Sequence, residues 1–161
     1  MHSKNKGNIG ELCAAKELSR LGYNVFRELG DLSKIDLIAE KDLKLIRFQV
    51  KAITPTKEVL QVKSSKSGPN YKFKYQDNMV DIFSIYDLEN DKIYWISSNE
   101  LLAKSMLSLR LVIPKNNQYY NVNWAKNYFD LNIALEKQFG SEWLKNIADD
   151  VAKAKDGSTP S

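Results

Sequence analysis

The sequence has one cysteine, Cys13, and one histidine, His2, among 161 residues. A single cysteine cannot form an internal disulfide or a cysteine-based zinc site. Because His2 lies in a terminus expected to fray, Ser-His-Asp or Cys-His catalysis and histidine-bound zinc are excluded as well. No apolar run approaches the roughly 18 residues of a membrane span, and the first ten residues lack the apolar segment of a secretory signal. Catalysis would therefore use carboxylates, lysine, hydroxyls or amides, with or without a hard metal ion.

Acidic residues are scarce in the first half of the chain. Residues 1–75 hold 15 Lys and Arg against 8 Asp and Glu, whereas residues 76–161 hold 9 against 12. A basic first half suggests a polyanionic partner, and the alternative is a solvated lysine-rich surface. The 43% hydrophobic and 27% charged content is typical of a globular domain. We expect one domain over 1–150 and a disordered tail over 151–161, which lacks an apolar anchor.

The hydrophobic pattern predicts a helix followed by strands, which is typical of an α/β or α+β domain with a mixed sheet. The helix covers 6–21, with Leu12, Ala14, Ala15, Leu18 and Leu21 on one apolar arc. Strands are expected at 23–28, 34–39, 43–53, 79–86, 92–97, 109–113 and 119–122, and a projecting hairpin at 59–63 and 71–75. A short helix is expected from Ser97 or Ser98 to 107, and two helices in 124–148 broken near Gly140.

Polar side chains in three apolar elements are candidates for catalysis. Asp36 interrupts the apolar run IDLIA, Glu11 lies in the apolar arc of the helix, and alternation puts Gln49 and Lys51 on a polar face of 43–53. A buried carboxylate is costly unless a metal ion, a lysine or a hydrogen-bond donor satisfies it. Together the four side chains suit a magnesium-dependent phosphodiesterase. Each also has a structural alternative: Glu11 exposed or paired with an arginine, Asp36 a turn residue, and Gln49 and Lys51 on a solvent-facing strand.

The segments KGNIGELCAAKEL, KIDLIAE and RFQVKAI, within residues 6–53, resemble the PD-(D/E)XK nuclease superfamily. The chain is most similar to the intron-encoded homing endonucleases of that type, and its first helix also resembles archaeal Holliday junction resolvases. The resemblance implies a restriction-endonuclease-like core with flanking helices. The motif proline is Ile35 here, and its second acidic residue is Gln49.

The resemblance also implies roles for individual residues. Glu11, Asp36, Gln49 and Lys51 would be catalytic, with Lys51 the catalytic lysine. Glu11, Asp36, Gln49 and the backbone carbonyl of Val50 would hold Mg²⁺ or Mn²⁺, with Ca²⁺ as a non-catalytic substitute. Because glutamine carries no charge, one metal or a weakly occupied second site is expected.

Residues 51–75 contain six lysines and one acidic residue, Glu58. The alternation Tyr-Lys-Phe-Lys-Tyr at 71–75 predicts a strand with its rings on the core and its lysines toward DNA, since the major groove admits a two-stranded ribbon. The alternative is an edge strand that its lysines protect from aggregation. Arg27 is a further candidate for phosphate contact. The predicted DNA-binding residues are Arg47, Lys57, Lys63, Lys66, Lys72 and Lys74.

These observations favour a site-specific homing endonuclease acting on double-stranded DNA with a long target site. The alternatives are a Holliday junction resolvase and a catalytically weak DNA-binding module. Cutting both strands needs two active sites, so at least a dimer is expected, and the resemblance implies a homotetramer. The aromatic-rich segment 124–148 is either an interface or ordinary core. Such an enzyme would act in the cytoplasm at the nucleoid of a bacterium, or in an organelle.

Overall fold

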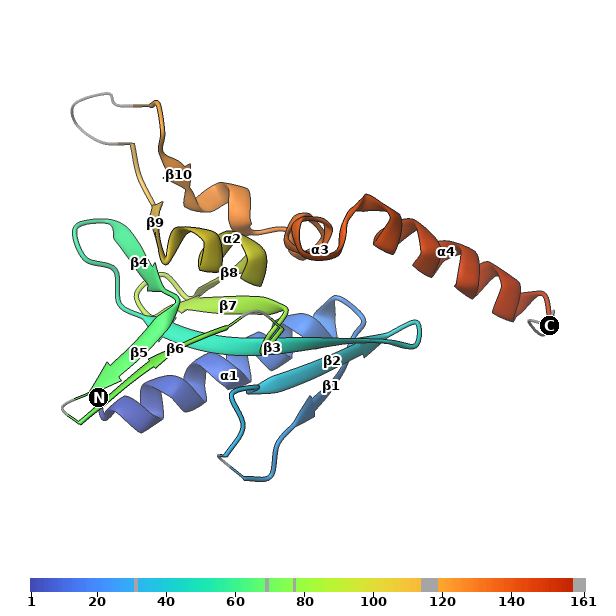
Figure 1. Ribbon diagram of the computed structural model, residues 1–161, viewed down its shortest axis with the longest axis horizontal. Helices are drawn as coiled ribbons and strands as arrows, with labels where there is room; N and C mark the ends of the chain where they lie inside the picture. The colour runs from blue at the N-terminus through green and yellow to red at the C-terminus, as the bar shows by residue number, and fades with distance from the viewer. Residues whose placement is uncertain (31, 69, 77, 114–118, 158–161) are drawn as a thin grey trace.

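The computed structural model describes residues 1–30, 32–68, 70–76, 78–113 and 119–157 (Figure 1). The helices are α1 (Ser3–Arg20), α2 (Ser98–Lys104), the 3-10 helix η1 (Ala125–Tyr128), α3 (Leu131–Phe139) and α4 (Ser141–Lys155). The strands are β1 (Asn24–Arg27), β2 (Leu37–Lys41), β3 (Lys44–Ile53), β4 (Val59–Lys63), β5 (Ser65–Gly68), β6 (Tyr71–Lys74), β7 (Ile82–Asp87), β8 (Lys92–Ser97), β9 (Met106–Arg110) and β10 (Asn123–Trp124). None of the helices described is both long and apolar enough to span a bilayer.

A mixed five-stranded sheet forms the centre of the molecule, in the order β1-β2-β3-β7-β8. Its central pair, β3 and β7, is parallel, with Phe48 opposite Ile82, and the other pairs are antiparallel. The chain between β3 and β7 contributes β4 to a second sheet, ordered β10-β9-β4, and forms the separate hairpin β5-β6. The mixed-sheet α/β fold expected from the sequence is thus confirmed.

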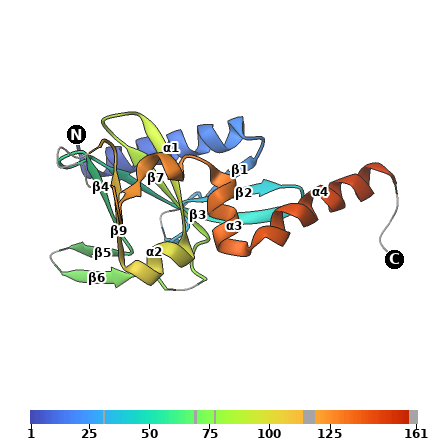
Figure 2. The ribbon, with the colours of Figure 1, turned by 90° about the horizontal axis from the view of Figure 1, so that it is seen from above.

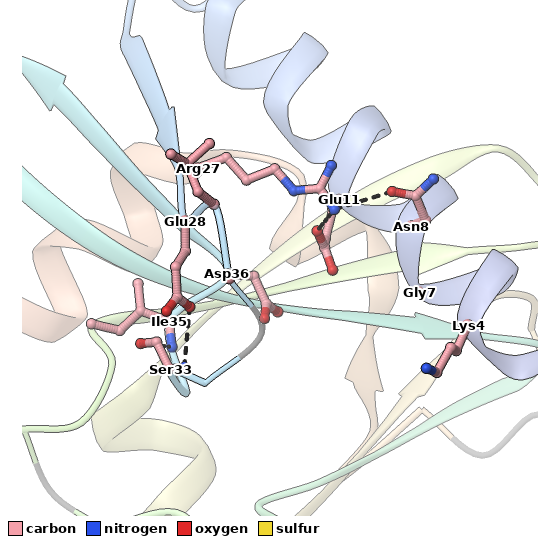
Figure 3. A pocket seen from close by; sticks show the side chains of 11 residues that line it. Lys4, Gly7, Asn8, Glu11, Arg27, Glu28, Ser33, Ile35 and Asp36 are labelled. Atoms are coloured by element: carbon pink, nitrogen blue, oxygen red, sulfur yellow. Dashed lines mark hydrogen bonds and ion pairs between the residues drawn. The ribbon is translucent and has the colours of Figure 1, made fainter.

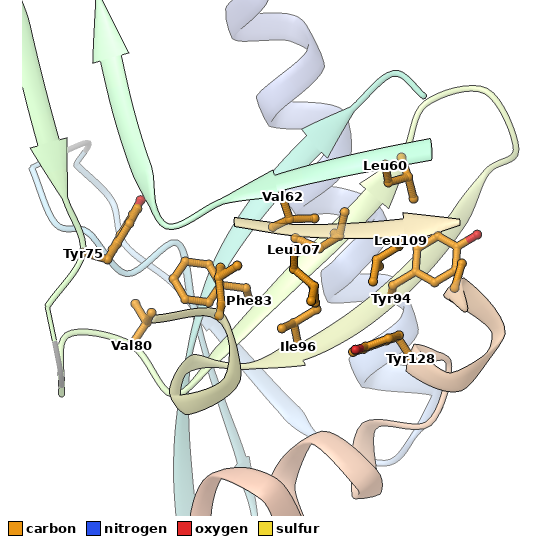
Figure 4. Close-up of a cluster of buried hydrophobic side chains, with 13 residues drawn as sticks. Leu60, Val62, Tyr75, Val80, Phe83, Tyr94, Ile96, Leu107, Leu109 and Tyr128 are labelled. Atoms are coloured by element: carbon orange, nitrogen blue, oxygen red, sulfur yellow. The ribbon is translucent and has the colours of Figure 1, made fainter. Parts of the chain in front are cut away.

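Two hydrophobic clusters cover opposite faces of the sheet. One includes Ala14 and Leu18 of α1, Phe48 of β3 and Leu135 of α3. The other packs the sheet against β4, β9 and η1, with Phe83 near its centre (Figure 4). The two faces of β3 therefore have different partners, which follows from the alternation of its side chains.

The face of α1 differs from the predicted arc. Gly10, Ala14 and Leu18 are buried, whereas Leu12 is 56% exposed and Leu21 is 41% exposed. Small residues define the contact because α1 lies close to the sheet: a Cβ on Gly10 would lie 3.1 Å from Ala52 Cβ. A hydrophobicity pattern gives little weight to glycine, so it centred the arc on the larger leucines instead.

The projecting hairpin is present but is built from β5 and β6, and the prediction of 59–63 as its first strand is wrong. That segment, β4, pairs with β9 in the second sheet. In Figures 1 and 2 the hairpin extends away from the central sheet. Phe73 and Tyr75 pack on the core while Lys72 and Lys74 are exposed, as the alternation predicts.

Differences elsewhere fall at element ends. α2 stops at Lys104 because Ser105 adopts a left-handed conformation, so 106–107 belong to β9 rather than to the helix. The strand expected at 119–122 is instead the two-residue β10 that follows. The break at Gly140 is confirmed, and α4 continues to Lys155, into the predicted tail (Figure 1). Residues 158–161 of that tail lie outside the described part of the chain.

Candidate active site

Asp36 lies where β2 separates from β3. Its backbone N–H donates to the carbonyl of Phe48 at 2.9 Å, and β2 begins at the next residue. The ladder between the two strands ends with Leu37 opposite Phe48. Beyond that point the Asp36 side chain provides the next hydrogen bond to β3, since its Oδ2 accepts the backbone N–H of Val50 at 2.7 Å. The carboxylate is therefore fixed against β3 by the end of the strand pairing.

Gln49 is 1% exposed and is held by three polar groups. Its Nε2 donates to Asp36 Oδ2, and to the carbonyl oxygen of Val50 at 3.3 Å. Its Oε1 accepts the hydroxyl of Tyr75 at 2.6 Å. The alternative of a solvent-facing Gln49 is therefore wrong. The oxygen Oε1 thus faces Tyr75, and the NH₂ group is the end of the amide that faces Asp36.

Lys51 lies on the same face of β3 as Gln49, about 6.6 Å further along the strand. Its Nζ is 5.1 Å from the ring centroid of Tyr75 and 5.6 Å from that of Phe83. Cation–π attraction to the two rings holds the ammonium over the base of the hairpin. Lys51 and Gln49 thus share Tyr75 as a neighbour.

Glu11 and Asp36 line one cavity of about 550 Å³. Figure 3 shows both carboxylates pointing into the space between α1 and the loop that precedes β2. The Glu11 side chain is 21% exposed and forms an ion pair with Arg27, with Nη2 2.6 Å from Oε2. The same Nη2 donates to Asn8 Oδ1 at 3.1 Å. Glu11 is therefore paired with an arginine, as the structural alternative proposed, and it also lines a polar cavity.

The donors at this cavity suit a hard divalent cation. Among the residues described there is no cluster of three His, Cys, Asp or Glu side chains that could enclose a metal. Mg²⁺ needs no such cluster, since it is usually held by one or two carboxylates while water and substrate phosphate complete its shell. Glu11 and Asp36 offer two carboxylates of that kind at the cavity, so these residues fit the metal expected from the sequence. The carbonyl of Val50, the predicted backbone ligand, accepts from Gln49 Nε2 at 3.3 Å.

The predicted DNA-binding residues lie outside this cavity. Lys57, Lys63, Lys72 and Lys74 are exposed, on the turn before β4, on β4 and on β6. The backbone of Lys66 is in β5, and its side chain is outside the described part of the chain.

Arg47 forms an ion pair with Asp81, which is 8% exposed. Its Nε and Nη2 donate to the two carboxylate oxygens at 3.0 and 2.7 Å, and its backbone N–H donates to Oδ2 at 2.8 Å. This two-point contact ties β3 to the start of β7. Contact of Arg47 with DNA stays a prediction.

Tyr75 is a polar partner in the site that the sequence did not indicate. Burial, and then the nearby charge of Asp36, raise the pKa of its hydroxyl well above the usual value, so it keeps its proton at neutral pH. The only signal for it was the alternation that placed its ring on the core. Nothing in that alternation indicates that the hydroxyl reaches a residue 26 positions earlier.

Three comparisons with known proteins bear on this site. A family model described as PD-(D/E)XK endonuclease matches residues 1–131. A solved bacterial homing endonuclease, I-Ssp6803I, superimposes with a TM-score of 0.69 at 19% identity, over 88% of this chain and 99% of that one. At that identity the likeness shows the fold, and it confirms the expected restriction-endonuclease-like core.

A curated relative from Sulfurihydrogenibium sp. (strain YO3AOP1) is 31% identical over 146 residues, 89% of this chain. It carries the name UDP-N-acetylglucosamine--N-acetylmuramyl-(pentapeptide) pyrophosphoryl-undecaprenol N-acetylglucosamine transferase. The chain spans 37% of the length of that relative, whose named activity is a statement about the longer protein. The family model, by contrast, covers both carboxylates, Gln49 and Lys51. By that match, the chain belongs to the PD-(D/E)XK endonuclease family.

Proposed function

We propose that this protein is a site-specific homing endonuclease that hydrolyses phosphodiester bonds of double-stranded DNA with a divalent metal. One observation carries the proposal. Glu11 and Asp36 line one cavity, and Gln49 is hydrogen-bonded to Asp36, two residues before Lys51. In chain order these are the positions of the family motif, with Gln49 in place of its second acidic residue.

In this proposal Glu11, Asp36 and the Val50 carbonyl hold Mg²⁺ or Mn²⁺. A bound cation supplies Lewis-acid polarisation of the phosphate and makes water a better nucleophile. Lys51 stabilises the negative charge that develops on the phosphate in the transition state. Arg27 would have to release Glu11 for Glu11 to hold the cation, and its side chain, 50% exposed at the cavity, would then be free to contact a phosphate oxygen.

DNA contact is assigned to the lysines of the hairpin and of β4. Lys72 and Lys74 are exposed on β6, whose rings face the core, and Lys63 is exposed on β4. A two-stranded ribbon with a basic face suits the major groove. Most of the binding free energy would come from phosphate neutralisation, with base contacts adding the specificity.

The proposed assembly is a homotetramer in which two subunits cut. The segment 124–148 contributes buried residues to the core, among them Tyr128, Leu131 and Leu135. It also carries exposed apolar side chains, with Phe129 45%, Ile133 44% and Phe139 37% exposed. Both readings of this segment therefore have support, and the proposed interface is its exposed part. The protein would act at the DNA of a bacterial nucleoid or of an organelle.

The decisive experiment incubates the protein and Mg²⁺ with a long randomised duplex library and a labelled four-way junction in one tube, and sequences the cut ends. Cutting at a few duplex sequences, lost with EDTA, is the expected result. Lys51→Ala should reduce the cleavage rate by about 100- to 1000-fold, as expected for loss of one transition-state donor, while DNA affinity changes little. Lys16→Ala, a change at an exposed lysine of α1 outside the proposed site and interface, is the matched control.

Two other outcomes would replace the proposal. Cutting only at the junction would identify a resolvase on the same fold. Binding without cutting would favour a DNA-binding module, the second candidate. One observation favours that candidate: Glu11 is neutralised by Arg27 at 2.6 Å, and Gln49 adds no charge to the metal site.

A further inference from the structure

The amide of Gln49 is surrounded by groups that fix which way it points. On one side lie the Asp36 carboxylate and the Val50 carbonyl, at 3.3 Å from Nε2. On the other side the Tyr75 hydroxyl is 2.6 Å from Oε1. Gln49 and Tyr75 are each 1% exposed, so bulk water does not replace these partners.

Hydrogen bonding to the protein groups around this amide favours one orientation. A carboxylate and a carbonyl only accept, so the atom of Gln49 that faces both must be the NH₂ group. The tyrosine hydroxyl can donate or accept, and opposite the amide oxygen it donates. Rotating the amide by 180° would put its oxygen against two other oxygens in a buried site, which is costly unless a cation lies between them.

We propose that Tyr75 is a positioning residue, which holds Gln49 as a hydrogen-bond donor to Asp36 and so keeps its amide oxygen away from the cation. This inference rests on the proposed nuclease function and differs from the sequence-based expectation that Gln49 ligates the metal. Gln49 then fixes the Asp36 carboxylate from the side, as outer partners commonly orient metal-ligating groups.

The position of Tyr75 is set by both strands of the hairpin. Its N–H donates to the carbonyl of Ser64 at 2.9 Å, just before β5, and it follows β6 directly. Its ring makes edge-to-face contacts with Phe73 and Phe83, at centroid distances of 5.1 and 5.2 Å. The hydroxyl therefore reaches Gln49 from a well-packed ring at the base of the proposed DNA-binding hairpin.

The first test follows the side-chain NH₂ of Gln49 by NMR on the isotope-labelled protein, with the signal identified by its loss in Gln49→Glu. We expect Tyr75→Phe to shift this signal and to speed its hydrogen exchange by about tenfold, the effect of about one lost hydrogen bond. Tyr128→Phe is the matched control, since Tyr128 is 6% exposed and its hydroxyl donates to Glu100 at 2.8 Å, in a different part of the molecule. An unchanged Gln49 signal in Tyr75→Phe would overturn the proposal.

The second test adds Mg²⁺ alone to the wild-type protein. If Gln49 stays a hydrogen-bond donor to Asp36, its NH₂ group should keep its slow hydrogen exchange when Mg²⁺ binds. If Gln49 ligates the metal, that slow exchange would be lost, and this result would refute the inference. The third measures cleavage: Tyr75→Phe should lower kcat by about 10- to 100-fold with KM nearly unchanged, as for loss of an outer partner. Should the wild-type protein cut no DNA, the proposed function fails, and the two NMR tests still decide the role of Tyr75.

Discussion

Replacing Gly10 by alanine tests whether the contact between α1 and β3 positions Glu11. A Cβ at residue 10 would lie 3.1 Å from Ala52 Cβ, 3.3 Å from Val50 Cγ1 and 3.6 Å from Tyr86 Cβ. The first two distances are shorter than ordinary van der Waals contact, so α1 has to move away from the sheet by a few tenths of an ångström. Glu11 is the next residue and moves with it.

The expected cost combines two opposing effects. Alanine gains about 1 kcal/mol over glycine inside a helix, and overpacking a core costs about 1–3 kcal/mol. Gly10→Ala should therefore change the free energy of unfolding by about 0 to −2 kcal/mol. Gly7→Ala in the same helix meets nothing within 4 Å and should gain about 1 kcal/mol. The two variants should thus differ by about 1–3 kcal/mol in free energy of unfolding. For a chain of this length, each kcal/mol corresponds to roughly 2–4 °C in Tm.

Thermal and urea unfolding of both variants measure this difference, with Gly7→Ala as the control for helix propensity. Gly10→Ala should also cleave DNA more slowly while binding it as the wild type does. Equal stabilisation of both variants would refute the close-contact argument. A Gly10→Ala protein that is destabilised but cleaves at the wild-type rate would show that the close contact contributes to stability without positioning Glu11.

Three further predictions concern charge. Lys72→Ala with Lys74→Ala should lower the slope of log K against log salt for DNA binding by up to about 1.8, at about 0.9 for each lost phosphate contact. Arg47→Ala should destabilise the fold by roughly 2–4 kcal/mol, because Asp81, 8% exposed, would lose its charged partner. Although burial alone would raise the pKa of Glu100, hydrogen bonds from a lysine and a tyrosine lower it. The contribution of Glu100 to stability is thus full above its unfolded pKa and is lost as the pH falls through the lower folded pKa. In urea titrations at a series of pH values, Glu100→Gln should therefore lose less free energy of unfolding at acid pH than the wild type does.

Each of these has a matched control. Lys16→Ala with Lys104→Ala removes two exposed lysines elsewhere and should leave the salt slope unchanged; an equal drop would argue against the hairpin. Asp81→Asn keeps an acceptor for Arg47, so it should cost less than Arg47→Ala. Glu142→Gln, at a residue whose side chain is 75% exposed, should leave the acid limb of the stability profile as in the wild type.

The sequence predicted those parts of the site that depend on local pattern. Alternation in 43–53 put Gln49 and Lys51 on one face of β3, as the structure has it. Ser97 or Ser98 was expected to cap α2, and the cap is Ser97, whose hydroxyl accepts the N–H of Glu100 at 3.1 Å. Both follow from neighbouring residues alone.

Contacts between distant residues were not predictable in this way. Tyr75 reaches Gln49 across 26 positions, and β4 pairs with β9 rather than with the nearby β6. A turn between two candidate strands favours pairing them locally, but burial of Leu60 and Val62 against β9 overrides it. The roles of the site residues stay predictions that the experiments above address.

The parallel pairing of β3 with β7 has a consequence for how target preference could diversify. Phe48 and Ile82 are 34 positions apart, and the hairpin lies wholly within the loop that their pairing closes. Closure entropy rises only with the logarithm of loop length, so doubling this excursion would cost about 0.6 kcal/mol. Glu11 and Asp36 precede this loop, and Lys51 lies within β3, before the chain leaves the strand. Insertions and deletions beyond the anchored base of the hairpin are therefore nearly neutral for folding and for the cleavage centre, which leaves this excursion as the part of the chain where length can vary most freely.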